Sequence, residues 1–362
     1  VTASGTGATK TITINGGSGS GYSDSDVDLH LNQSGPTPGY VLTWNGSDYA
    51  WTANGTGSGL GDMVDDTTPQ LGGNLDLNGN DMLLNGQRIK IYNKEDIGDV
   101  DWSGCDYVID ASGVGKNFQQ AHTLHEKYGV KRVFITNSNS HSDFELVIGV
   151  NDDKIDRKHK VVSCSICDTT ALAPVLKLLD ENYSITGGSI TTVHPWLNYQ
   201  NVLDGQSRYQ SNPKQTYHNY ALGRASSTNI IPKWTTALDA TDRVLSGIKE
   251  KLMVFSYRTP HAIVGSADLT ICLDKLPDLN TVANLLDISE EKQTHNIFKN
   301  DFEPLVSSDF ISSVFSCHID RRWLEYKNKT LKLVLWYDNE FGYSNRVIDQ
   351  VSLYRNLDLE KK

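Results

Sequence analysis

The stretch over residues 161–179 constrains the fold most, because a strand-like run, a turn and a helix-like pattern follow one another there. Val161 and Val162 are β-branched, and the apolar residues after the turn recur at helical spacing. Polar residues at 168–170 suit a helix N-terminus, and Pro174 is tolerated in a first helical turn. The stretch therefore predicts a turn from a strand into a helix.

The predicted turn carries two cysteines, Cys164 and Cys167. A cysteine at such a turn faces free backbone N–H groups and the positive end of the helix dipole, which favour its thiolate. Nucleophilic thiols are usually built in this way. The alternative is a buried cysteine that acts as a small hydrophobic residue, and this stretch alone is compatible with both interpretations.

The composition changes near residue 83. Residues 1–83 hold nine Asp, a single basic residue, 16 of the 30 glycines and no cysteine. Alternating runs at 11–14, 27–31 and 40–44 are typical of brief strands, and the Asn-Gly pairs at 15, 45 and 78 are typical of hairpin turns. We expect this segment to be loose in isolation or ordered by oligomerisation.

The rest of the chain has two patterns. Runs at 88–92, 106–110 and 131–136, with a helical pattern at 118–128, predict parallel α/β packing, and further apolar runs occupy 145–150 and 160–162. Beyond the cysteine helix, strands are predicted at 189–193, 252–257, 267–273, 312–317 and 331–336, and helices at 236–251, 278–287 and 343–355. Several consecutive strands with few helices between them predict a mixed or antiparallel sheet, so the fold class is α/β plus α+β.

The totals exclude several classes of protein. A net charge of −11 argues against a general nucleic-acid surface. Five cysteines form no small disulfide framework, which favours a reducing compartment. No apolar run reaches the length of a membrane span, and no secretory signal is evident. We expect a cytoplasmic protein with no metal site.

Cys167 and His194 are the candidate catalytic pair. A histidine within hydrogen-bond reach can hold a thiolate and relay a proton. His194 ends an apolar strand-like run, where a side chain can reach a site at the edge of a sheet. Taken alone, His194 also fits a structural histidine, and the sequence does not show whether the two side chains approach each other.

Six motifs in order carry a family resemblance. They are DASGV at 110–114, IGVN at 148–151, SCSICDTTALAP at 163–174, TTVH at 191–194, NIIP at 229–232 and WYDNEFGYSNRV at 336–347. Through them, residues 84–362 resemble glyceraldehyde-3-phosphate dehydrogenase and its sister, erythrose-4-phosphate dehydrogenase. The last motif is long and highly specific.

The resemblance implies a covalent mechanism. The Cys167 thiolate would attack an aldehyde to give a thiohemiacetal, and His194 would accept the hydroxyl proton. Hydride would pass to NAD or NADP, and phosphate or water would resolve the thioester. The aldehyde would be a small, phosphorylated molecule, and the enzyme would be a homo-oligomer, a tetramer.

The resemblance also assigns binding residues and domains. Arg224, Thr235 and Thr169 would hold substrate or phosphate, although a solvated loop charge and a helix N-cap are alternatives for the first two. The cofactor residues would be Ser112, Gly113, Thr136, Asn339 and Tyr343, the last two being otherwise a turn residue and a core aromatic. Residues 84–163 would be a truncated nucleotide-binding part, 164–335 the catalytic domain, and 336–362 a C-terminal helix packed back on the nucleotide-binding part.

Residues 1–83 form domain one and resemble the stalks of tailed-phage fibre and virion proteins. The resemblance rests on residues 22–32, 39–49 and 65–79. Such stalks are trimeric spacers without chemistry, whereas the alternative is a disordered acidic tail. A second functional hypothesis follows: a virion structural protein that uses a dehydrogenase-derived domain for binding or assembly. A third possibility is a segment joined by recombination to an ordinary dehydrogenase.

The chain departs from the dehydrogenase pattern in two ways. Asp168 and Ile166 replace a threonine and a serine beside the nucleophile, and Leu197 and Tyr199 replace two threonines beyond the histidine. In addition, no G-x-G-x-x-G turn between a strand and a helix is evident, and the glycine-rich 55–61 is interpreted as linker. We therefore expect weakened phosphate binding and weakened or lost cofactor binding.

Overall fold

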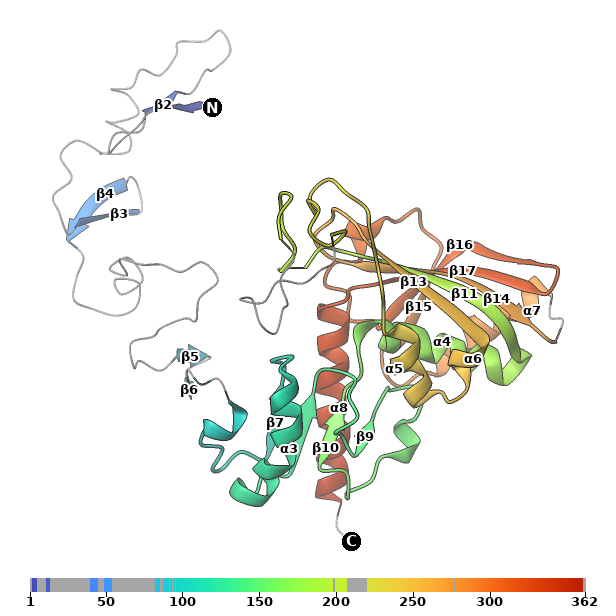
Figure 1. Cartoon of the computed structure of the whole chain (residues 1–362), viewed down its shortest axis with the longest axis horizontal. Helices are drawn as coiled ribbons and strands as arrows, with labels where there is room; N and C mark the ends of the chain where they lie inside the picture. Colours follow the sequence, from blue (N-terminus) through green and yellow to red (C-terminus); the bar gives the residue numbers. More distant parts are fainter. Residues whose placement is uncertain are drawn as a thin grey trace. The chain divides into compact units, whose positions relative to one another are not determined.

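A computed structural model describes residues 96–197, 199–206, 220–275 and 278–360, together with residues 90, 92 and 94 and short strands before them. The chain divides into two compact units, Val1–Asn93 and Lys94–Lys362 (Figure 1). No helix in the described ranges is both long and apolar enough to cross a membrane.

Unit Val1–Asn93 contains short antiparallel hairpins among its described residues. β1 (Thr2–Ser4) pairs with β2 (Thr11–Thr13), β3 (Tyr40–Trp44) with β4 (Tyr49–Ala53), and β5 (Met82–Leu84) with β6 (Gln87–Ile89). The predicted strands at 11–14 and 40–44 are therefore present. The predicted strand at 27–31 and the three Asn-Gly pairs lie outside the described residues.

The first sheet of unit Lys94–Lys362 is parallel, as predicted. The run predicted as a strand at 88–92 does not belong to it, because β6 (Gln87–Ile89) pairs antiparallel with β5 in unit Val1–Asn93. The strand order of the sheet is β7-β8-β10-β9, and every pair is parallel. The strands are β7 (Tyr107–Asp110), β8 (Arg132–Ile135), β9 (Phe144–Glu145) and β10 (Val161–Ser163), with α3 (Gly115–Tyr128) between the first two and short 3-10 turns η1 (Ile97–Asp99) and η2 (Asp152–Lys154). The apolar run at 145–150 contributes a single strand residue, because the chain turns at Gly149, whose φ is 85°.

The second sheet is mixed, also as predicted. Its order is β12-β13-β11-β14-β17-β16-β15, with parallel pairs β11/β13 and β15/β16 and antiparallel pairs elsewhere. The strands are β11 (Ile185–His194), β12 (Ile231–Lys233), β13 (Leu252–Arg258), β14 (Gly265–Leu273), β15 (Phe298–Asp301), β16 (Cys317–Lys327) and β17 (Thr330–Tyr337). Alternate residues of β14 and β17 are buried, because one face of this sheet packs on the core.

Helices cover the buried face of the mixed sheet (Figure 1). They are α4 (Cys167–Tyr183), α5 (Ala237–Val244), α6 (Ile248–Lys251) and α7 (Leu279–Lys292); η3 (Ser307–Phe310) and α8 (Phe341–Leu359) complete the chain. Leu172, Leu176 and Leu179 are fully buried and belong to the same core cluster as Leu269 of β14. About 25 cal/mol per Å² of buried apolar surface stabilises this packing.

Two sequence predictions in this part were wrong. The single helix predicted at 236–251 is broken into α5 and α6, because Gly247 has a φ of 86° that a helix does not allow. The strand predicted at 312–317 is a loop up to β16, since Ser312 has a φ of 64° and Ser313 bonds back to Phe310. Apolar content alone therefore misplaced the start of this strand.

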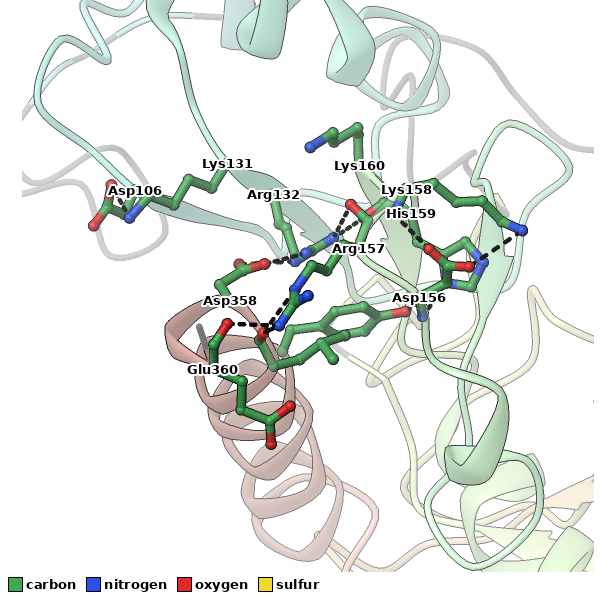
Figure 2. A network of polar contacts seen from close by, with 12 residues as sticks. Asp106, Lys131, Arg132, Asp156, Arg157, Lys158, His159, Lys160, Asp358 and Glu360 are labelled. Atoms are coloured by element: carbon green, nitrogen blue, oxygen red, sulfur yellow. Dashed lines mark hydrogen bonds and ion pairs between the residues drawn. The ribbon is translucent and has the colours of Figure 1, made fainter. Parts of the chain in front are cut away.

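Helix α8 returns to the parallel sheet. Val347 and Tyr354 share a core cluster with Phe134 and Val162. The fully buried Arg132 of β8 donates from Nη2 to Oδ1 of Asp358 at 2.5 Å. Figure 2 shows this pair, with Arg157 donating to the backbone carbonyls of Leu357, in the last turn of α8, and of Glu360, directly after it.

Candidate functional site

The site begins at the turn between β10 and α4, which the sequence predicted. Ser165 has a φ of 58°, a left-handed conformation that costs a residue other than glycine about 1 kcal/mol or more. Two hydrogen bonds stabilise the turn: the Ser165 N–H donates to Ser163 Oγ at 3.1 Å, and the Tyr343 hydroxyl donates to the Ser165 carbonyl at 3.0 Å. The turn places Cys167 at the first position of α4.

Cys167 is half-buried at this helix terminus. Burial raises the pKa of its thiol, and the neighbouring Asp168 carboxylate raises it further. Arg258 and the backbone N–H groups of Cys167 and Asp168 act in the opposite direction without reversing the shift. The thiol is therefore mostly protonated at neutral pH, although the helix terminus by itself favours a thiolate.

Asp168 joins two side chains from other elements. Its Oδ1 accepts from His194 Nε2 at 2.8 Å and from the Tyr337 hydroxyl at 2.7 Å. The side chains of Asp168 and His194 are only 7% and 6% exposed, and Tyr337 is buried. The rings of His194 and Tyr337 meet edge to face with centroids 6.0 Å apart. A buried carboxylate thus lies between the predicted catalytic histidine and a tyrosine.

Strand register brings these groups together. Gly265 is paired with Tyr337, and a Cβ at position 265 would lie 2.7 Å from a carbon of the tyrosine ring. Glycine there lets the ring reach Asp168. Arg258 at the end of β13 is paired with both His194 of β11 and Ile231 of β12. The ends of these strands therefore gather around the turn that carries Cys167.

Arg258 and Lys233 are site residues that the sequence interpretation missed. Arg258 donates from Nη1 to the Pro195 carbonyl at 3.1 Å, and its Nε is buried without a hydrogen-bond partner. Burial, followed by the charge of Arg258, lowers the pKa of Lys233 to about 8, while Asp168 opposes the shift. The sequence contained a signal that could have identified both residues as site candidates. Arg258 directly follows a predicted strand, and Lys233 directly follows the NIIP motif.

The three predicted phosphate residues all make contacts within the protein. Arg224 pairs with Asp204 through Nε at 3.2 Å, and both side chains are 61% exposed. The Thr169 hydroxyl is fully buried, 3.5 Å from the Ala237 carbonyl, so it contacts α5. Thr235 Oγ1 accepts from the Ala237 N–H at 3.1 Å, but the N-cap residue of α5 is Thr236, one residue further on. These placements favour Arg258 over Arg224 as the cation of the site.

The predicted cofactor residues of the parallel sheet lie at its carboxyl edge. Ser112 follows β7 and donates to Asp110 Oδ1 at 2.6 Å, Gly113 has a φ of 67°, and Thr136 follows β8. Dinucleotides bind at this edge of α/β sheets. Oδ2 of Asp110 is buried there without a partner, which fits a polar ligand group.

The other two predicted cofactor residues, Asn339 and Tyr343, contact the start of β14 and the cysteine turn. Asn339 Oδ1 accepts from the Val264 N–H at 3.2 Å, and Tyr343 bonds to Ser165. The residues present therefore fit the nicotinamide part of a dinucleotide. The described residues supply no glycine-rich turn for the pyrophosphate.

A parallel sheet with a nucleotide edge, joined through a cysteine turn to a mixed sheet, is typical of two-domain dehydrogenases. The family model of the glyceraldehyde 3-phosphate dehydrogenase C-terminal domain matches residues 166–339. Glyceraldehyde-3-phosphate dehydrogenase of Thermotoga maritima is 33% identical over 284 residues, which cover 78% of this chain and 82% of that protein.

Two eukaryotic relatives give the same result. The glyceraldehyde-3-phosphate dehydrogenase of Neurospora crassa is 32% identical over 300 residues, 82% of this chain and 86% of that protein. Glyceraldehyde-3-phosphate dehydrogenase 1 of Drosophila melanogaster is 32% identical over 297 residues, which cover 81% of this chain and 86% of that protein. The chain belongs to the glyceraldehyde-3-phosphate dehydrogenase family.

Proposed function

We propose that this protein is an NAD- or NADP-dependent dehydrogenase that oxidises a small phosphorylated aldehyde through Cys167. The observation that supports it most is the position of Cys167, at the first turn of α4 and close enough to Arg258 and Lys233 for their charges to interact. In this proposal the Cys167 sulfur bonds to the aldehyde carbon, and the two cations attract an anionic substrate.

The cofactor would be held at the carboxyl edge of the parallel sheet. Ser112, Gly113 and Thr136 would face the dinucleotide, and Asn339 and Tyr343 would position its nicotinamide beside the cysteine turn. The thiol proton would pass to the aldehyde oxygen as the carbon–sulfur bond forms. NAD or NADP, when bound, would supply the hydride acceptor for the resulting thiohemiacetal, whose hydroxyl proton would pass to water. Phosphate or water would then release the acyl group of the thioester from Cys167. We propose weak binding, because the described residues provide no pyrophosphate cradle.

The direct test is turnover by the full chain. NADH or NADPH formation is measured with glyceraldehyde 3-phosphate, with and without inorganic phosphate, for the wild type and for Cys167→Ser. We expect slow turnover that Cys167→Ser abolishes, and a Cys272→Ser control that keeps it. No turnover and no calorimetric binding of either cofactor would contradict the proposal.

A virion structural protein remains the second candidate. The observation in its favour is that residues 1–93 form a compact unit of their own, with hairpin strands among its described residues, distinct from the dehydrogenase-like unit. The two candidates differ in assembly and in place: a tetramer in the cytoplasm for the enzyme, a trimer in a virion for the fibre. Light scattering of the full chain separates them, since the subunit mass is 40.1 kDa.

A further inference from the structure

The buried cluster of Asp168, His194 and Tyr337 fixes the positions of its protons. Asp168 Oδ1 accepts two hydrogen bonds, from His194 Nε2 at 2.8 Å and from the Tyr337 hydroxyl at 2.7 Å. Burial by itself would raise the pKa of Asp168, but the charge and hydrogen bond of His194, the Tyr337 hydrogen bond and the charge of Arg258 together lower it. Asp168 is therefore a carboxylate, and both partners donate to it.

A nitrogen that donates cannot also accept. Because Nε2 of His194 carries the proton shared with Asp168, it has no lone pair with which to accept a proton from a thiol. The basic nitrogen that remains is Nδ1, on the other side of the ring. A mechanism in which His194 takes a proton through Nε2 is therefore closed while the Asp168 hydrogen bond is made.

We infer that Asp168 is a positioning residue that holds His194 Nε2 as a hydrogen-bond donor, so that His194 does not serve as the base of the Cys167 thiol. This inference rests on the proposed role of Cys167 as the nucleophile. Asp168 then lowers thiol reactivity twice, by occupying the imidazole and by adding a negative charge next to the sulfur. The cations that face the cluster from β13 and β12, Arg258 and Lys233, offset only part of that charge.

The test measures thiol chemistry rather than turnover. The full chain is treated with iodoacetamide between pH 6 and 10, without cofactor or substrate, and alkylation of Cys167 is followed by fragment mass spectrometry. This readout separates Cys167 from the exposed Cys105 and from the buried Cys164. We expect the wild-type rate to rise with a midpoint above about 8.5, the ordinary value for a thiol.

Asp168→Ala should lower this midpoint by at least one unit and raise the rate at pH 7.5 about tenfold, because His194 Nε2 becomes free to accept. The double variant Asp168→Ala/His194→Asn should lose most of this gain in rate and keep only the smaller part that comes from removing the charge of Asp168. Asp168→Val keeps more of the side-chain volume and has no hydrogen-bond acceptor, so it replaces Asp168→Ala if the smaller residue unfolds the chain. Asp239→Asn, on the surface of α5, is the matched control and should change nothing.

Three outcomes would overturn the inference. They are a midpoint of wild-type alkylation below pH 7, no gain in alkylation rate in a folded Asp168 variant, and a gain in the double variant as large as in Asp168→Ala alone. The last would show that the charge of Asp168 acts alone. Because alkylation needs no cofactor, a chain that shows the predicted shift but no turnover would retain this inference and lose the proposed function.

Discussion

Lys233 carries a half-buried charge whose energetic cost depends on pH. In the unfolded chain a lysine titrates near 10.4, whereas burial and Arg258 lower the folded pKa of Lys233 to about 8. Below pH 8 the folded state must hold a disfavoured ammonium, and above about pH 10.5 this penalty disappears. Lys233→Met should therefore be more stable than the wild type at pH 6.5, by about 1–3 kcal/mol, and equal to it near pH 10.5.

Urea unfolding at the two pH values measures this difference. Lys249→Met is the control, because Lys249 is 58% exposed in a surface pair with Asp239 and should change stability by less than about 1 kcal/mol. A Lys233→Met variant that is equally or less stable at pH 6.5 would show that the ammonium is well solvated in the folded protein.

Substitution of Arg258 and substitution of Arg224 should differ in their effects on substrate binding. Arg258 lies among the strand ends near Cys167 with an unpartnered Nε, whereas Arg224 is exposed and paired with Asp204. Loss of a charge-assisted hydrogen bond costs about 1.5–3 kcal/mol. We expect Arg258→Gln to lower kcat/KM for the phosphorylated aldehyde by about 10- to 100-fold and Arg224→Gln by less than twofold. A larger loss in Arg224→Gln would restore the sequence-based assignment.

At the scale of single residues, the sequence predicted only features that depend on residues close together in the chain. The turn that carries Cys167 follows from β-branched residues, capping residues and helical spacing within about twenty positions. The partners of Asp168 could not be predicted in this way, because His194 and Tyr337 reach it through strands 26 and 169 residues away. Their approach depends on sheet register, which no short pattern specifies.

At the scale of elements, one glycine sets the contact between β14 and the site. A Cβ on Gly265 would lie 2.7 and 2.8 Å from two ring carbons of Tyr337. We expect Gly265→Ala to displace this ring and to destabilise the protein by about 1–3 kcal/mol in urea unfolding. Gly115→Ala is the control, because a Cβ there meets nothing within 4 Å, and helix propensity predicts a neutral or slightly stabilising effect. Equal changes in the free energy of unfolding of the two variants would contradict a steric conflict between a Cβ at position 265 and the Tyr337 ring.

The properties of whole helices and strands also explain which of them the sequence predicted correctly. Long apolar alternations such as β14 and β17 were predicted almost to their ends, since each must bury one face on the helices. The break between α5 and α6 depends on the φ of Gly247, and a glycine within a helical pattern does not by itself reveal its conformation. Backbone conformation at single residues was therefore the main source of error.

At the scale of the whole Lys94–Lys362 unit, the C-terminal helix is fixed to the parallel sheet by a buried charge (Figure 2). The Arg132 side chain is 1% exposed, donates to Asp358 through Nε and Nη2 and to the His159 carbonyl through Nη1, and lies 4.4 Å from the centroid of the Tyr354 ring. Asp358 also accepts from the Tyr107 hydroxyl at 3.1 Å. The last turn of α8 therefore neutralises a cation that the sheet buries.

Removal of one partner from a buried ion pair leaves a charge without compensation, which costs about 3–5 kcal/mol. Asp358→Asn retains an acceptor oxygen, so we expect it to lower the free energy of unfolding by about 2–4 kcal/mol. The control is Asp106→Asn, which breaks the pair between Asp106 and Lys131. These two side chains are 60% and 50% exposed, so this variant should lose less than about 1 kcal/mol.

Because α8 also carries Tyr343, which supports the cysteine turn, hydrogen exchange in Asp358→Asn should accelerate at residues 163–167 as well as along the helix. Exchange that accelerates only in the last turn of α8 would mean that this ion pair acts locally and does not stabilise the site.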